Sequence, residues 1–250
     1  MIRVRSYLLA FAVAALASVA AQAMPVTVPA GLNPGDTYRL AFVTSTTTNA
    51  DSTDINFYNQ FVTDAANLSP ELAALGTTWT AIASTATDDV RYNTSTLTLA
   101  EGGTRSAPIY GTDGYLIAAD NDEFWQVSFP FPGRRNPLFH LDENGITTAP
   151  GEGPWSVWTG GRSQLASPYT FQLGSTDRIF LGIIGRPDDG WWVSTSVLPG
   201  GERPLYAISG FLTVPASMMT EHATFTIFTL GIVGLGLAGC RRRHRRSQRA

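Results

Sequence analysis

Apolar residues along the chain recur first at helical spacing and later in short runs, and this change predicts the order of its elements. In 54–68 the apolar positions Ile55, Tyr58, Phe61, Val62 and Ala65 fall on one face of a helix. The residues suited to cap its start are Asp51, Ser52 and Asp54. A second short helix is predicted over 69–75, with Pro70 at its first helical position and Gly76 closing it.

Short runs rich in β-branched and aromatic residues follow, and each is bounded by turn residues. These runs predict strands over 37–45, 78–84, 108–110, 115–119, 138–141, 146–148, 155–159, 179–184, 191–197 and 205–214. The glycine-containing segments 111–114 and 142–145 predict hairpin-like connections. One early strand, then helices, then many strands predict a single α+β domain with a mainly antiparallel sheet.

The first 23 residues have the pattern of an export signal. Arg3 and Arg5 precede an apolar run over 7–20, and Ala21 and Ala23 frame a small-residue cleavage site. We therefore expect a signal peptide over 1–23, a mature chain beginning at Met24 and an exported ectodomain over 24–213.

The opposite end has the pattern of a membrane helix. Residues 223–240 are apolar and uncharged, which is near the lower length limit for crossing a bilayer. An arginine-rich tail over 241–250 follows, and arginines hold such an end on the cytoplasmic side. The arginines that carry this signal are Arg241, Arg242, Arg243, Arg245 and Arg246.

Charge and cysteine content exclude several functions. All 17 basic side chains are arginine, and only nine of them lie within 24–220, against 19 of the 20 acidic residues. We expect no nucleic-acid partner, because that binding needs clustered positive charge. The single cysteine, Cys240, lies in the apolar tail, so no disulfide within the ectodomain is possible and packing alone must stabilise it.

Catalytic and metal-binding patterns are sparse. His140, the single histidine within 24–213, stands between apolar residues, so we interpret it as a packed and hydrogen-bonded side chain rather than a base. Zinc needs several histidine or cysteine ligands, which the ectodomain lacks. Oxygen ligands for calcium are present in one acidic segment, for which a solvated turn is the preferred interpretation, and we expect neither a metal nor another cofactor. The residues of that acidic group are Asp113, Asp120, Asn121, Asp122 and Glu123.

Two surface chemistries remain open. Trp191 and Trp192 would face opposite sides of a strand, so one of them could stack on a sugar while Asp188 and Asp189 bind its hydroxyls. The preferred interpretation is that both tryptophans close the core. Paired carboxylates at 88–89 and 188–189 leave a surface glycan hydrolase as the alternative to a non-enzymatic binding protein.

The C-terminal layout resembles the PEP-CTERM sorting signal of Gram-negative bacteria. That signal joins a Val-Pro-Glu-Pro motif, a spacer, an apolar helix and an arginine-rich end. Val214 and Pro215 match the start of the motif, and Ala216 and Ser217 stand in place of its Glu-Pro pair. The resemblance implies a sorting motif and spacer over 214–222, recognition by an exosortase-like enzyme, and display at the cell surface or in the extracellular matrix.

The ectodomain resembles the C-type-lectin-like fold more loosely. The segments that carry this likeness are Gly76–Ser84 (GTTWTAIAS), Asp142–Gly145 (DENG) and Val157–Gly160 (VWTG). The resemblance implies two early helices and tryptophan-bearing strands late in the chain. We expect an exported protein of the cell envelope without enzymatic activity that binds exopolysaccharide.

Overall fold

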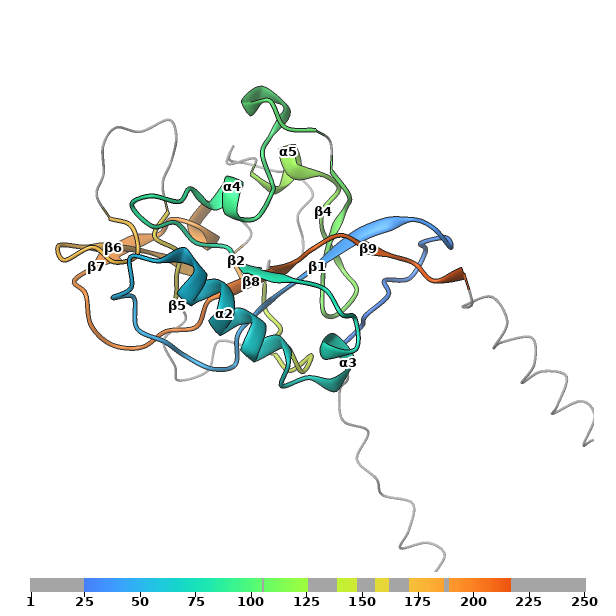
Figure 1. Ribbon diagram of the computed structural model, residues 1–250, viewed down its shortest axis with the longest axis horizontal. Coiled ribbons are helices and arrows are strands. Elements are labelled where there is room, and N and C mark those ends of the chain that lie inside the picture. The colour runs from blue at the N-terminus through green and yellow to red at the C-terminus, as the bar shows by residue number, and fades with distance from the viewer. Residues whose placement is uncertain are drawn as a thin grey trace, which may run out of the picture.

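The protein is an α+β structure with mainly antiparallel sheets, which confirms the predicted class. The computed structural model describes residues 25–104, 106–125, 139–147, 156–161, 171–186 and 189–216. Figure 1 shows the larger sheet crossing the middle of the molecule, with helix α2 lying across it. The predicted signal peptide, apolar helix and arginine tail lie outside the described residues. Within those residues, no helix is long and apolar enough to span a membrane.

The larger sheet has the strand order β2-β8-β1-β3-β4, and β9 pairs with the start of β1. Only the pair β1–β3 is parallel; the other pairs of this sheet are antiparallel. Its strands are Thr37–Val43 (β1), Trp79–Ala81 (β2), Ile109–Gly111 (β3), Leu116–Ala118 (β4), Tyr206–Ser209 (β8) and Leu212–Thr213 (β9).

Strand β1 divides the core in two because side chains alternate between the faces of a strand. Tyr38, Leu40 and Phe42 pack into the hydrophobic cluster that includes α2. Ala41 and Val43 pack into a second cluster on the opposite face. Almost all of β1 is buried, Arg39 included, so both faces of the strand are covered and its sequence does not alternate between apolar and exposed polar residues.

Helix α2 (Ile55–Ala66) covers the first face, as its apolar spacing predicted. Asp54 is the N-cap, and its side chain accepts a hydrogen bond from the backbone N–H of Asn56. The short helix α3 (Pro70–Ala73) follows, with Ser69 as its N-cap.

The second face is covered by short elements and by a group of rings that we call the aromatic cluster. Helices α4 (Val90–Asn93) and α5 (Asn121–Phe124) and the 3-10 turn η1 (Leu99–Glu101) lie here. Four-residue helices carry too little periodicity to be predicted from sequence. The aromatic cluster comprises Phe124, Trp125, Phe139, Trp191, Trp192 and Tyr206, with neighbouring ring centroids 4.5–6.2 Å apart.

A smaller antiparallel sheet joins β5 (Ser156–Trp158), β6 (Ile179–Ile183) and β7 (Thr195–Val197). Trp158 connects the two sheets, because its backbone N–H donates to Pro204 O at 3.1 Å and its indole N–H donates to Thr48 O at 2.9 Å. The predicted strand over 191–197 is wrong at its start, since Trp191 ends a 3-10 turn, η2 (Asp189–Trp191). The predicted hairpin around 142–145 is reduced to a single bridge between Leu141 and Thr147.

Candidate functional site

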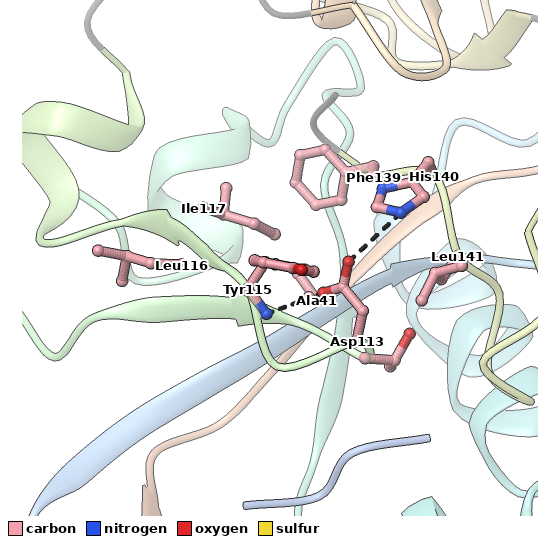
Figure 2. A pocket seen from close by; sticks show the side chains of 10 residues that line it. Ala41, Asp113, Tyr115, Leu116, Ile117, Phe139, His140 and Leu141 are labelled. Atoms are coloured by element: carbon pink, nitrogen blue, oxygen red, sulfur yellow. Dashed lines mark hydrogen bonds and ion pairs between the residues drawn. The ribbon is translucent and has the colours of Figure 1, made fainter. Parts of the chain in front are cut away.

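Two hollows open on the described surface, and the first surrounds the histidine at position 140. We call it the Asp113–His140 hollow; it lies between the β3–β4 turn and the segment 139–141. Asp113 Oδ1 accepts the backbone N–H of Tyr115 at 2.9 Å, while Oδ2 faces His140 Nε2 at 3.3 Å (Figure 2). His140 therefore has a polar contact, as expected, but it stands outside any strand.

The segment 139–147 is fixed to the sheet beside this hollow. Val43 donates its backbone N–H to Leu141 O at 3.0 Å, and Thr112 Oγ1 donates to Asp142 O at 3.1 Å. Phe139 has a φ of 48°, a left-handed conformation that is uncommon for a bulky residue. The hollow offers about 20 Å³ of free space, enough for one water molecule.

Glu143 is fully buried next to this segment, and it holds a loop rather than facing a ligand. Its carboxylate accepts hydrogen bonds from the backbone N–H and the hydroxyl of Ser45. Burial raises the pKa of Glu143 above its ordinary value, because the charged form loses its hydration, although the Ser45 bonds work in the opposite direction.

The second hollow is larger and has no carboxylate among its described lining residues. We call it the Phe211 hollow; it offers about 400 Å³ of free space, within the range of small-molecule sites (roughly 300–1,000 Å³). Four stretches of chain form it: helix α4, the segment 94–106, the start of α5 and the β8–β9 connection. Its lining residues are Arg91, Tyr92, Ser95, Leu97, Gly103, Thr104, Ser106, Asn121 and Phe211.

The wall of the Phe211 hollow is tightly constrained. Trp125 Nε1 of the aromatic cluster donates to Thr96 Oγ1 at 2.8 Å. Gly103 lies so close to the carbonyl of Leu97 that a β-carbon at this position would overlap the carbonyl oxygen. Ser95 has a φ of 55°, so the wall contains a left-handed residue other than glycine.

The positive charge in the described lining of this hollow, on Arg91, is already balanced by a neighbouring carboxylate. Arg91 Nη1 forms an ion pair with Glu101, and the Arg91 guanidinium lies 5.0 Å from the ring centroid of Trp125. Burial on its own would raise the pKa of Glu101, but bonds from Thr98 and the charge of Arg91 outweigh it and hold the pKa below its ordinary value. The Glu101 carboxylate is therefore ionised at neutral pH.

Two polar atoms of the Phe211 hollow have no hydrogen-bond partner among the described residues. Asn121 is 3% exposed; its Nδ2 donates to Leu97 O at 3.1 Å, whereas its Oδ1 is unpaired. The buried Oγ of Ser106 is also unpaired. Buried polar atoms are normally hydrogen-bonded, so these two atoms are exceptions within the lining of this hollow.

The proposed tryptophan platform is wrong for this structure. Trp191 and Trp192 are only 4% and 5% exposed and both belong to the second core cluster, which was the preferred interpretation. The expectation that they face opposite sides of a strand fails because a 3-10 turn directs both rings into the core. Asp188 lies outside the described residues, and of Asp189 the structure describes only the backbone.

The acidic group around α5 does not converge on a metal. Asp120 caps α5 by accepting the N–H of Glu123, Asp122 accepts the N–H of Leu99, and Glu123 accepts the N–H of Ala119. Asp113 is engaged with His140. Within the described part of the chain, no three histidine, cysteine, aspartate or glutamate side chains are placed to hold a metal ion.

Of the carboxylate pairs proposed for a hydrolase, the structure describes the side chains of Asp88 and Asp89, and each of these serves a local turn or cap. Asp88 accepts the hydroxyls of Thr85 and Thr87, and Asp89 caps α4 through the N–H of Arg91. Neither hollow brings two carboxylates of described residues face to face.

Val214, the first residue of the predicted sorting motif, packs with the domain. It is buried and exchanges backbone hydrogen bonds with Gly35 and Asp36 at 3.0 and 2.9 Å, while Pro215 is exposed beyond it. The other predicted site residues of the termini, Ala21, Ala23, Met24 and the tail arginines, lie outside the described residues.

Sequence reasoning missed most of the Phe211 hollow. Asn121 was considered only as a calcium ligand, and Arg91, Ser106 and Phe211 were not singled out. The one usable signal was Gly210 followed by an aromatic residue inside the predicted strand over 205–214. No protein-family model matches this chain, and a search of curated proteins finds no match.

Proposed function

We propose that this chain is an exported protein of the cell surface or extracellular matrix that binds polysaccharide without transforming it. The observation that carries the proposal is the Phe211 hollow, which combines free space, unpaired buried oxygens and exposed rings. Rings that stack on sugars and side chains that bind hydroxyls are the two chemistries that carbohydrate recognition needs. The lining contains no acid pair of the kind that glycoside hydrolysis uses.

Two tyrosines of similar exposure, one at each hollow, can be used to test which hollow binds the polysaccharide. Tyr92 is 65% exposed at the Phe211 hollow, and Tyr115 is 61% exposed at the Asp113–His140 hollow. The full-length protein in detergent should be retained on exopolysaccharide from the producing cells. Tyr92→Ala should weaken retention several-fold and Tyr115→Ala should leave it unchanged. No retention of the unmodified protein would rule the proposal out.

We further propose that an exosortase-like enzyme sorts the protein through residues 214–250, as the resemblance implies. Neutral replacement of the five tail arginines should cause mis-sorting, because it removes the orientation signal. Mass spectrometry of membrane and extracellular fractions tests this directly. Finding only intact chains, all of them in the membrane, would exclude processing and leave a single-span protein.

The C-type-lectin-like likeness remains part of this proposal. The helices α2 and α3 come early and the strand that carries Trp158 comes late, which supports the likeness. The fold would not by itself assign a ligand.

A further inference from the structure

The chemistry of the Phe211 hollow specifies the charge of its ligand. We propose, resting on the proposed function, that this hollow binds a neutral sugar residue through its hydroxyls and does not accept uronic acids or other anionic sugars. The residues assigned to recognition are Asn121 and Ser106 in the hollow and Phe211 and Tyr92 at its mouth.

Asn121 requires a donor from the ligand. Its Nδ2 bond to Leu97 O fixes which way the amide faces, so the unpaired atom is the oxygen. An amide oxygen accepts hydrogen bonds and cannot donate. A sugar hydroxyl supplies the missing hydrogen, whereas a carboxylate or sulfate oxygen placed against Oδ1 would bring two acceptors together.

Ser106 accepts a wider range of partners and adds a second contact. A hydroxyl both donates and accepts, and Ser106 Oγ is unpaired and buried. Both residues line the same hollow, so a sugar that presents several hydroxyls has two unpaired partners there.

The nearby cations do not favour an anion. Arg91 is paired with Glu101 and lies against Trp125. Arg39 is buried beneath Phe211, outside the lining, and its Nε and Nη1 donate to Ser209 O and Thr94 O at 2.7 and 2.8 Å. An anion entering the hollow would lose its hydration and find no unpaired cationic donor among the described lining residues, of which Arg91 is the single cation.

Phe211 supplies the apolar contact. The ring is 59% exposed, and the Arg39 guanidinium lies 5.3 Å from its centroid. One face of the ring is thereby occupied and the other remains for the C–H face of a sugar. Together the ring and the unpaired oxygens specify a ligand that is apolar on one side and rich in hydroxyls on the other.

Retention on defined polysaccharides tests the inference with the full-length protein in detergent. The neutral probes are dextran, mannan and galactan, and the acidic probes are alginate and polygalacturonate. We expect retention on at least one neutral probe and none on the acidic ones. Ser106→Ala should weaken that retention about tenfold, the loss of one hydrogen bond that leaves its partner unpaired. The melting temperature should stay unchanged, because the hydroxyl bonds to nothing in the described fold.

Phe211→Leu should also weaken retention several-fold, and its matched control is Phe57→Leu, a half-exposed ring on α2. Retention on acidic probes only would overturn the neutral-sugar inference while polysaccharide binding stands. Retention that survives Ser106→Ala and Phe211→Leu but fails in Tyr115→Ala would overturn the site and leave the function. If the protein is retained on no probe, native exopolysaccharide included, both the neutral-sugar inference and the proposed function are wrong.

Discussion

The Asp113–His140 hollow and the Phe211 hollow, both lined by described residues, differ in size and in the kind of polar group that lines them. In the Asp113–His140 hollow a carboxylate, an imidazole and a backbone N–H contact one another around space for a single water. In the Phe211 hollow the amide oxygen of Asn121 and the hydroxyl of Ser106 remain unpaired beside about 400 Å³ of free space. In the first hollow Asp113 Oδ2 also lacks a hydrogen bond but faces His140 Nε2, whereas the second hollow leaves neutral polar atoms that the proposed ligand would satisfy.

Both hollows nevertheless share one backbone feature. Each has one left-handed residue other than glycine in its wall, Phe139 in the smaller and Ser95 in the larger. Such conformations persist only where the surroundings impose them. The aromatic cluster supplies these surroundings at both sites, through Phe139 itself and through Trp125 against Arg91. The hollows differ instead in free space and in the neutral polar atoms left unpaired in the larger one.

The largest predicted effect comes from removing a ring of the aromatic cluster, which packs beside both hollows. Trp191→Ala should cost about 3–5 kcal/mol of unfolding free energy, because a buried ring in contact with Phe124, Trp125 and Phe139 leaves a cavity. Denaturant unfolding of the full chain measures the loss. Trp191→Phe, which keeps a ring, should cost less, and a loss below about 1 kcal/mol for the alanine variant would contradict the burial of this side chain.

Each hollow has a glycine at which an added β-carbon would collide with a neighbouring atom. The two neighbours differ in how easily they can move. Gly103→Ala should cost about 3 kcal/mol, because the new carbon meets the backbone carbonyl of Leu97. Gly111→Ala meets Asp113 Oδ1 at 2.7 Å, a side-chain end that can move, and should cost about 1 kcal/mol. Gly102→Ala is the control for strain alone, since its φ is +82° and nothing lies within 4 Å of the new carbon. If thermal unfolding shows a larger loss of stability for Gly111→Ala than for Gly103→Ala, this part of the comparison is wrong.

Two glutamates beside the hollows should respond to pH with opposite signs. The pKa of Glu101 is lowered in the folded state, so the stability it contributes is present above its unfolded pKa of about 4.3 and is lost as pH falls through the folded pKa. Glu101→Gln should therefore cost about 1 kcal/mol at pH 7 and almost nothing at pH 3.

The pKa of Glu143 is raised, so its contribution is present below the unfolded pKa and is lost as pH rises through the folded pKa. Glu143→Gln should compare more favourably with the wild type at pH 7 than at pH 4. Melting temperatures of both variants and the wild type from pH 3 to pH 8 check the two signs. Parallel curves for all three proteins would refute both assignments.

The smallest effect concerns the pair at the smaller hollow. His140→Gln removes a partly exposed contact with Asp113 and should cost less than about 1 kcal/mol. Retention on polysaccharide should stay at the wild-type level. A loss of retention as large as that of Tyr92→Ala would mean that the two hollows act together.

The sequence allowed the elements with strong periodicity to be predicted and gave little information on the site. Strand β1 and helix α2 follow from apolar spacing and an Asp54 cap, and both were predicted within about two residues. Trp191 and Trp192 were placed on a strand because local propensity does not reveal that the chain turns into the core there. Asn121 and Ser106 come together from segments 15 residues apart, joined by contacts that periodicity does not encode.

Strands β1 and β9 run antiparallel, and Gly35 and Asp36 hold Val214 at the end of this pair. Residue 214 lies at the open end of this pair, so tension drawn from it would open the pairing one hydrogen bond at a time instead of shearing it. Strand β9 is only Leu212–Thr213, and Phe211 is the residue directly before it. A tether that pulls on this end would therefore draw Phe211 away from its hollow before the rest of the sheet opens, so mechanical load would act first on the strand next to the proposed binding residue.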